Sequence, residues 1–526
     1  MSTPPHSEPS VVRAPVSIEG RTAEDGTAYT RFAESTAQMT SGPIHDPLDE
    51  YQSPVSGYQI LVRLRIQNRP GNLGRVTTVI GALGADVSSV DIVEARTEYV
   101  IRDLRLFCLD EANARAIINV LAGVDGIEVM YASDRTFELH HGGKITVENR
   151  VHIRNAIELS YVNWPGAERV AGHIQKEPDS VWALTVKANS VAIVTDGTAV
   201  LGLGDVGPYA AMPVMEGKSM LFRAFAGIDA WPICLNTTDP DEIVDIVKGI
   251  APGFGGILLE DISAPRCFEI EDRLKALLHI PVFHDDQHGT AVVVLAALIN
   301  SLKIVEKRPE DLKVVLVGVG AAGLACARIL MNFGVKNIVG FDRFGAIYTG
   351  RTEGMSPELD WFAERTNAEG FDGTIAEAMV GADVFLGLSR PRLITPEQVE
   401  QMAPNAIVFA LANPEPEIMP NLIAGKARII ATGRSDFPNQ VNNVLCFPGL
   451  FRGTIDARAT VISEEMKIAA ARAIAETIPD DLLHEDYILP SVFNLDVTRR
   501  VAEAVAAEVE RSGKPRPPVK PVSIFD

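Results

Sequence analysis

The sequence is short of cysteine and of long apolar stretches, and each shortage excludes a class of protein. Its 526 residues include five cysteines that lie far apart and form no CxxC pair: Cys108, Cys234, Cys267, Cys326 and Cys446. That spacing excludes a disulfide scaffold and a cysteine-ligated zinc site, and it predicts buried thiols in a reducing compartment. The longest apolar run, 291–299, is far shorter than the roughly 20 residues of a membrane span. With no basic and then apolar start to the chain, we predict a cytoplasmic protein.

Positive charge is also in deficit. Lys and Arg number 48 against 69 Asp and Glu, which gives a formal net charge of −21. Such a balance repels phosphate backbones and anionic membranes, so we expect neither nucleic acid nor a membrane as a partner. Hydrophobic residues make up 46% and charged residues 22%, as in a soluble protein with a sizeable core. At roughly 100 to 200 residues per domain, the chain has room for about three or four folded units.

The two ends of the chain read differently from the middle. Residues 1–57 are rich in Ser, Thr, Pro and Glu and have no sustained apolar period, which predicts a disordered tail. Residues 512–526 contain repeated prolines, which predict a second, extended tail or an arm that lies on a neighbouring molecule. Between about 58 and 138 the apolar period changes several times. It indicates strands near 60–66, 87–93, 104–109 and 127–131, with helices near 73–83 and 114–121.

This βαββαβ order, with the turn RPGNLG (69–74) after the first strand, resembles an ACT domain, a small ligand-sensing α+β module found on many metabolic enzymes. The resemblance implies an amino acid or small-metabolite effector near Gly71, Asn72 and Asp86, commonly at an interface between two copies. The alternative is a ferredoxin-like domain without a ligand, with a structural or dimerising role.

From about 142 onward, strands alternate with helices, which predicts an α/β fold with a mostly parallel sheet. A strand-like run at 312–317 leads into GVGAAG (318–323), and a helical pattern follows at 324–333. A GxGxxG turn between a strand and a helix is typical of a Rossmann-type dinucleotide site, because the glycines admit the pyrophosphate at the helix N-terminus. The predicted cofactor-binding residues are Gly318, Gly320, Ala321, Ala322 and Gly323.

The residue after the next strand bears on which dinucleotide binds. The strand 338–341 ends at Asp342, which lies 19 positions beyond Gly323 and is suited to bond a ribose 2′-hydroxyl. That favours NAD. The neighbouring Arg343 would instead attract the 2′-phosphate of NADP, so NADP stays open as the alternative.

Two pairs of acids follow apolar strands. Glu260 and Asp261 follow the strand 256–259, and Asp285 and Asp286 follow 280–284. Neighbouring side chains on a regular strand point to opposite faces, so each pair shares a ligand only where its strand breaks into a loop. Clustered carboxylates need a cation, and all-oxygen ligands suit Mg²⁺ or Mn²⁺. Solvated loops or helix caps are the alternative, but the dinucleotide motif in the same chain favours a metal site. For the nearby His284 and His288, a supporting role is favoured over ligation.

At this point the chain resembles a malic enzyme of the shorter bacterial type, over roughly residues 142–475. The stretches that carry the resemblance are DGTAVLGLGD (196–205), PVMEGK (213–218), LEDI (259–262), FHDDQHGTA (283–291), FALANP (409–414) and NNVLCFPG (442–449). Malic enzymes oxidise malate with NAD or NADP and decarboxylate the product to pyruvate. The resemblance implies a substrate and metal domain (142–288), a Rossmann-type domain (289–475), and C-terminal helices (476–511) that return to the first catalytic part.

The resemblance also assigns roles by position. It makes Glu260, Asp261 and Asp286 the metal ligands, and Lys218 the base that takes the hydroxyl proton, with a pKa lowered by the neighbouring cation. Asp285 orients or relays that proton. Asn413 matches an amide that holds substrate and cofactor, and Asn443 matches one that holds substrate.

One departure concerns the general acid. The family usually carries Tyr-Thr-Pro-Gly, whose tyrosine protonates the enolpyruvate carbon, but here the stretch is LSYVNWPG (159–166) and Asn163 stands at the tyrosine position. Tyr161 lies two residues earlier, and on an extended segment residues i and i+2 share a face about 6 to 7 Å apart. Tyr161 is therefore a candidate for a displaced acid, and water or Lys218 is the alternative.

Three functional hypotheses follow. The first is an ACT-regulated, metal-dependent malic enzyme, active as a homodimer or larger assembly. The second is a malate- or nucleotide-binding regulator that kept the site and lost the chemistry, as Asn163 suggests. The third is an enzyme that performs only oxaloacetate decarboxylation or 2-keto acid reduction.

Overall fold

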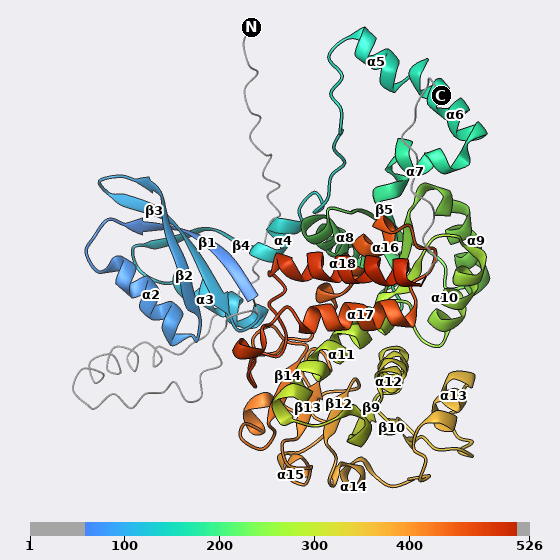
Figure 1. The fold of residues 1–526 in the computed structure, drawn as a ribbon. Coiled ribbons are helices and arrows are strands. Elements are labelled where there is room, and N and C mark those ends of the chain that lie inside the picture. The colour runs from blue at the N-terminus through green and yellow to red at the C-terminus, as the bar shows by residue number, and fades with distance from the viewer. Residues whose placement is uncertain (1–57, 513–526) are drawn as a thin grey trace. The chain divides into compact units, whose positions relative to one another are not determined.

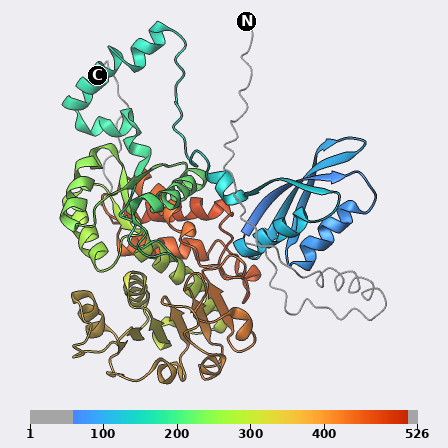
Figure 2. The same cartoon turned by 180° about the vertical axis from the view of Figure 1, so that it is seen from behind.

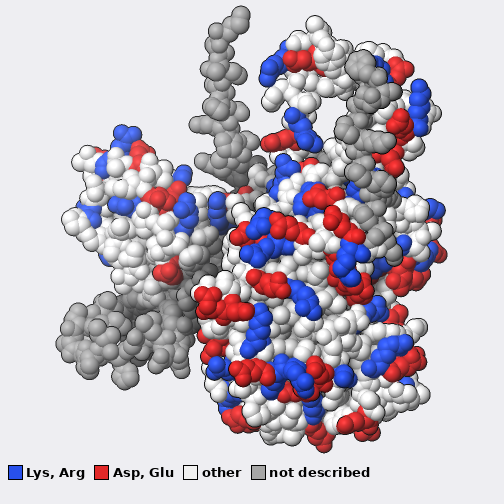
Figure 3. Space-filling view, in the orientation of Figure 1, with Lys and Arg blue, Asp and Glu red and all other residues white. Residues whose placement is uncertain are grey.

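The structure is a computed structural model that describes residues 58–512, and the two predicted tails lie outside this range. Three sheets form within it (Figures 1 and 2). On the face drawn in Figure 3, basic and acidic side chains are interspersed and no large basic patch gathers. All five cysteines are free thiols, as predicted; four are buried and Cys234 is half-buried.

The N-terminal domain has the predicted βαββαβ order. Its elements are β1 (Tyr58–Gln67), α2 (Asn72–Ala82), β2 (Asp86–Ala95), β3 (Tyr99–Cys108), α3 (Glu111–Ala122) and β4 (Ile127–Asp134). The sheet has the order β2-β3-β1-β4 with antiparallel pairing throughout. Alternate residues of β1, from Ile60 to Ile66, are buried against Val76 and Ile80 of α2 and Ile117 of α3. Both helices therefore cover one face of the sheet, as period-2 and helical patterns in one segment predict.

The topology separates the predicted effector residues within one copy of this domain. Gly71 and Asn72 follow the end of β1, whereas Asp86 begins β2 and pairs with Phe107, which itself pairs with Gln59 at the start of β1. The crossover helix α2 returns the chain to the end where β1 began. Asp86 thus lies about 25 Å along the sheet from Gly71 and Asn72, at roughly 3.3 Å per residue. The three residues do not form one site in a single copy.

A helical segment connects this domain to the second sheet. It contains α4 (Arg135–His140), α5 (Ala156–Val162), α6 (Gly166–Lys176) and α7 (Val181–Leu184), and neither α5 nor α6 has a buried residue. The chain then enters a parallel α/β unit. Its elements are β5 (Ser190–Thr195), α8 (Gly207–Ala226), β6 (Asp229–Cys234), α9 (Pro240–Ile250), β7 (Gly256–Leu259), α10 (Arg266–Leu277) and β8 (Val282–His284).

The second sheet is parallel, with the order β6-β5-β7-β8. Every residue of its central strands β5 and β7 is buried, as expected for strands covered on both faces. Because all four strands run the same way, their carboxyl ends meet at one edge of the sheet. The residues that follow these strands are thereby brought together.

Helix α11 (Asp285–Val305) contains the longest apolar run. It is the one described helix that is long and apolar enough to cross a membrane. Most of its side chains are buried, and it packs against α12 and α17 inside the protein. Its composition is thus that of a core helix, and its first turn carries Asp285 and Asp286.

The third sheet has the predicted Rossmann-type arrangement. Its strands are β9 (Lys313–Val317), β10 (Asn337–Asp342), β11 (Gly345–Ala346), β12 (Val384–Gly387), β13 (Ile407–Ala410) and β14 (Ile429–Thr432). They have the order β11-β10-β9-β12-β13-β14, parallel except for β11. The helices of this part are α12 (Ala321–Phe333), α13 (Pro357–Arg365), α14 (Ile375–Met379) and α15 (Pro396–Glu400).

Three C-terminal helices return to the first catalytic part, and only the last of them lies within the predicted range 476–511. They are α16 (Phe447–Asp456), α17 (Glu464–Ala475) and α18 (Leu495–Arg511). Helices α16 and α18 both pack on α8. Their crossing is close: a Cβ on Gly453 would lie 2.4 Å from the carbonyl oxygen of Ala502.

Candidate active site

A cluster of acids lies at the carboxyl edge of the second sheet. Glu260 and Asp261 directly follow β7, and Asp285 and Asp286 begin α11 directly after β8. Asp261 adopts a left-handed backbone with φ 54°, a conformation that few residues other than glycine take. Its amide donates to Oδ2 of Asp286 over 2.8 Å, which joins the two acidic pairs. The predicted break after the strand is therefore present.

Three of these acids fit a divalent cation. Glu260, Asp261 and Asp286 each offer an oxygen, and the three oxygens lie within 4.8 Å of one another. Buried oxygens Oε2 of Glu260 and Oδ2 of Asp261 have no hydrogen-bond partner. An all-oxygen set with unsatisfied buried carboxylates suits Mg²⁺ or Mn²⁺. Burial, with Asp286 nearby, raises the pKa of Asp261 to about 7, and burial also raises the pKa of Glu260 well above its ordinary value.

Lys218 reaches the same cluster from α8. Its Nζ lies 2.5 Å from Oδ2 of Asp285 and 2.7 Å from Oε1 of Glu260, and the residue is only 8% exposed. Burial alone would lower the pKa of Lys218, but the two carboxylates outweigh it and raise that pKa above its ordinary value. The pKa lowering predicted beside a cation therefore requires a positive charge that offsets Asp285 and Glu260.

Asp285 is the most enclosed member of the cluster. It is fully buried, and its Oδ2 accepts a second hydrogen bond of 2.6 Å from Nδ2 of Asn443. A Cβ at Gly289, one turn later in α11, would lie 1.9 Å from Oδ1 of Asp285, so only glycine fits there. Asn443, expected to hold substrate, thus also contacts Asp285.

The dinucleotide motif has the geometry that its glycines predict. Gly318 has φ 101°, and a Cβ there would meet the carbonyl oxygen of Leu388 at 2.4 Å. A Cβ on Gly323 would meet the oxygen of Gly318 at 2.2 Å, whereas Gly320 faces open space. Open space over the middle glycine suits the approach of a pyrophosphate. Ala321 and Ala322 form the first turn of α12, as predicted.

A cavity of about 410 Å³ adjoins this turn. It is lined by Gly318, Val319, Gly320, Asp342, Arg343, Phe344, Gly354, Leu359 and Leu388. Asp342, at the end of β10, is held by a buried arginine that sequence reasoning missed. Arg351 binds both carboxylate oxygens, at 2.8 and 2.5 Å. The predicted alternative, Arg343, lies over the ring of Phe344 at 4.7 Å.

Asn413 follows β13 in the Rossmann-type part. Its Nδ2 donates to the carbonyl oxygen of Leu411 over 3.3 Å, and a Cβ on Gly433 would approach it to 3.1 Å. These contacts lie within the Rossmann-type part and do not include the carboxylate cluster.

The structure does not bring Tyr161 to the cluster, and it corrects the conformation that we expected there. Residues 156–162 form α5, and Asn163 caps its C-terminus, so the segment is helical and not extended. On a helix, positions i and i+2 do not face the same side, so Tyr161 does not substitute geometrically for position 163. Tyr161 is 71% exposed, whereas Glu260, Asp261 and Asp285 are buried and Asp286 is half-buried.

Two sets of buried partners were missed because no motif marks them. Arg266 binds Asp196 at 3.1 Å and Thr198 at 3.0 Å, and so fixes the loop before α8. Glu271 and Lys467 bind opposite nitrogens of His288, as a supporting role for that histidine requires. These contacts join residues far apart in the sequence.

Two family models match the chain. The malic enzyme N-terminal domain matches residues 169–275, and the malic enzyme NAD binding domain matches residues 287–511. The chain belongs to the malic enzyme family. The second match runs through α18, so the NAD-binding part of this malic enzyme chain includes the helices that return to α8.

Relatives agree with this membership. The NAD-dependent malic enzyme of Geobacillus stearothermophilus is 52% identical over 457 residues, which cover 87% of this chain and 95% of that protein. The bifunctional malic/malolactic enzyme of Bacillus subtilis is 50% identical, over 76% of this chain and 98% of its own. The crystal structure of malic enzyme from Pyrococcus horikoshii superposes with a TM-score of 0.69 at 46% identity, and covers 72% of this chain and 89% of that one.

Proposed function

We propose that this protein catalyses the oxidative decarboxylation of malate to pyruvate and CO₂, with NAD as the hydride acceptor and Mg²⁺ or Mn²⁺ as the bound metal. The observation that carries the proposal is Lys218, buried between Asp285 and Glu260 beside three carboxylates that fit a divalent cation. The NAD-dependent relative at 52% identity supports the choice of cofactor.

The proposed chemistry uses this chain's residues for proton transfer. The C2 hydride of malate passes to the nicotinamide, and Lys218 accepts the hydroxyl proton. Lys218 must first lose its own proton, and Asp285, whose pKa is raised by burial, is placed at 2.5 Å to take it. Glu260, Asp261 and Asp286 would hold the divalent cation, which would supply Lewis-acid stabilisation of negative charge on the C2 oxygen.

The reaction releases one proton from the malate hydroxyl and takes up one proton at C3, so the site needs no net proton. Loss of CO₂ breaks the bond between C3 and its carboxylate, and C3 then takes up one proton. That number equals the one proton released from the hydroxyl, so Lys218 can return it without a second acid. Asn443 holds Asp285 in place, and Asn413 is proposed to contact the substrate and cofactor.

The test is malate-dependent reduction of NAD with Mn²⁺, with pyruvate and CO₂ measured in the same reaction. Equal amounts of NADH, pyruvate and CO₂ are expected. CO₂ release from oxaloacetate without malate oxidation would instead support the partial-reaction enzyme. A protein that neither oxidises malate nor acts on oxaloacetate is not an active malic enzyme.

A second candidate function rests on Asn163, which stands where the family carries its tyrosine. A malate- or nucleotide-binding regulator would be stabilised thermally by malate or NAD without forming pyruvate. Steady pyruvate formation rules it out.

Regulation and assembly complete the proposal. The N-terminal domain is proposed to act as an ACT-type sensor of an amino acid or small metabolite, in a cytoplasmic homodimer or larger assembly. Because Gly71 and Asp86 lie at opposite ends of one sheet, an effector site containing both needs two copies. Sedimentation with and without candidate amino acids tests both points.

A further inference from the structure

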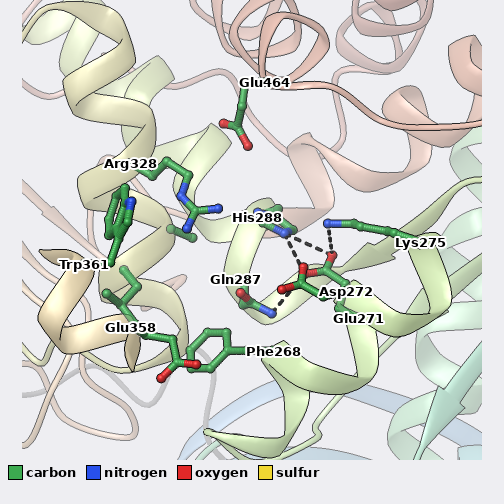
Figure 4. A pocket seen from close by; sticks show the side chains of 12 residues that line it. Phe268, Glu271, Asp272, Lys275, Gln287, His288, Arg328, Glu358, Trp361 and Glu464 are labelled. Atoms are coloured by element: carbon green, nitrogen blue, oxygen red, sulfur yellow. Dashed lines mark hydrogen bonds and ion pairs between the residues drawn. The ribbon is translucent and has the colours of Figure 1, made fainter. Parts of the chain in front are cut away.

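A group of buried charges lies behind the acidic cluster, outside the proposed reaction path. Glu271 lines a cavity of about 110 Å³ between α10, α11, α12, α13 and α17, together with His288 and Glu464 (Figure 4). Glu271 of α10 and Lys467 of α17 are each 3% exposed. Charges are rarely buried this far unless they are paired, and here both residues also bond to the segment 284–288.

Glu271 accepts hydrogen bonds from the segment 284–288 on the side of α10. Its carboxylate accepts from the backbone amide of His284 over 3.1 Å, from Nε2 of His288 over 3.0 Å and from Nε2 of Gln287 over 3.3 Å. A fourth bond of 2.8 Å comes from Nζ of Lys275 on its own helix. Three of the four donors therefore flank Asp285 and Asp286. Figure 4 shows the three side-chain donors converging on Glu271.

Lys467 contacts the same segment on the side of α17. Its Nζ bonds Nδ1 of His288 over 3.0 Å and Oε1 of Glu464 over 2.7 Å. An ammonium can only donate, so Nδ1 of His288 accepts and Nε2 carries the hydrogen that Glu271 receives. This arrangement fixes the orientation of the ring and ties α17 to the first turn of α11.

We propose that Glu271 and Lys467 are positioning residues, which act through His288 and the backbone of His284 to aim the carboxylates of Asp285 and Asp286. The inference rests on the proposed function, because it assumes that Asp286 binds a divalent cation. Removing Glu271 leaves the amide of His284 and the ring of His288 without their acceptor. The first turn of α11 then loses its fixed direction, while the dinucleotide cavity on the third sheet is untouched.

The experiment measures Mn²⁺ binding to the full-length protein by electron paramagnetic resonance, without substrate, for the native chain, Glu271→Gln and Lys467→Met. Glutamine keeps the shape of Glu271 but replaces an oxygen acceptor by a donor. We expect each variant to weaken Mn²⁺ binding by about tenfold or more, as loss of partners around metal ligands does. NAD binding, followed by fluorescence, should stay within about twofold of native, as expected for a site built on another sheet.

Glu269→Gln is the matched control. Glu269 lies on the same helix, two residues before Glu271, and pairs at the surface with Arg273 over 2.8 Å. We expect it to bind Mn²⁺ as the native protein does. Equal weakening of Mn²⁺ and NAD binding in Glu271→Gln would mark a general structural role and overturn the proposal.

The remaining outcomes are also decisive. Folded Glu271→Gln and Lys467→Met with native Mn²⁺ affinity would overturn the inference and leave the proposed function intact. A native protein that binds no Mn²⁺ would instead overturn the metal site on which both rest. If Glu271→Gln does not fold, Lys467→Met carries the same test, because it acts on His288 from α17.

Discussion

Lys218 and Asn443 donate to the same oxygen of Asp285, over 2.5 and 2.6 Å. The lysine comes from α8 and the asparagine from the short helix Asn443–Leu445 before α16, so the buried carboxylate joins two segments more than 200 residues apart. The ammonium also binds Glu260, which is one of the three proposed metal ligands. Lys218 therefore competes with a cation for one carboxylate.

Replacing Lys218 by methionine tests that competition. We expect malate oxidation to fall by about 10² to 10⁴, the usual loss for a general base. Mn²⁺ should bind more tightly than in the native protein, because Glu260 loses its ammonium partner. The metal-free variant should melt at a lower temperature than metal-free native protein, because the buried carboxylates of Asp285 and Glu260 lose the ammonium group that pairs with them. Titration measures the Mn²⁺ affinity and calorimetry the melting temperature, with the exposed Lys248→Met as control. Native activity in Lys218→Met would contradict the assigned role.

Metal binding should depend on pH because of Asp261. Its pKa is raised to about 7 by burial and by Asp286, and a carboxylate must be ionised to bind a cation. Binding therefore releases a proton from Asp261 below pH 7, and Glu260, whose pKa is also raised, adds to the effect. Mn²⁺ affinity should rise by about tenfold per pH unit or more from pH 5 to 7. A flat profile between pH 5 and 7, measured by titration calorimetry in two buffers, would contradict the raised pKa.

The raised pKa of Asp261 also determines whether the stability of the metal-free protein rises or falls with pH. A carboxyl whose folded-state pKa exceeds its unfolded value of about 3.9 binds more protons when folded, so metal-free stability falls as pH rises from about 4 to 7. Asp261→Asn removes this group and should flatten that part of the profile. Chemical denaturation of metal-free protein at several pH values checks it.

Periodicity and short motifs were enough to predict most of the fold. The alternation in β1, the helical spacing of α2 and the strand before Gly318 are local patterns, and each predicted element is present. The carboxylate cluster was also predictable, because acids that follow parallel strands must meet at one sheet edge. Lys218 came from the family resemblance alone, since nothing in its local pattern distinguishes it from a surface lysine.

The residues that could not be placed from the sequence depend on features that no local pattern records. That Gly71 and Asp86 lie at opposite ends of one sheet was also not readable, because spacing along the chain does not say to which end of a sheet a crossover helix returns; a shared effector site between two copies stays a prediction. Tyr161 was placed on an extended segment because α5 is short and buries no residue, so it has no amphipathic signal. The partners Arg351, Glu271 and Lys467 were missed because their contacts depend on tertiary packing.

Cofactor choice should depend on the pair Asp342 and Arg351. Asp342→Ser removes the predicted acceptor for the ribose 2′-hydroxyl and leaves Arg351 buried without its carboxylate. We expect the KM for NAD to rise by about 10- to 100-fold, the cost of a hydrogen bond to a charged group. Use of NADP should improve, because Arg343 and Arg351 then face the 2′-phosphate without an opposing charge. Steady-state kinetics with both cofactors checks this, with the exposed Asp360→Ser as control. An unchanged preference would remove Asp342 from cofactor recognition.

Tyr161→Phe decides where the last proton comes from. Tyr161 lies on α5 and is 71% exposed. In the proposed mechanism, Lys218 holds the one proton that the reaction must return. We therefore expect the variant to keep kcat within about threefold of native, since loss of a general acid costs about 10² to 10⁴. NADH and pyruvate should still form in equal amounts. Malate oxidation with accumulating oxaloacetate would show the opposite: Tyr161 would then be the acid, brought to a catalytic site by a movement of α5 or by another copy of the chain.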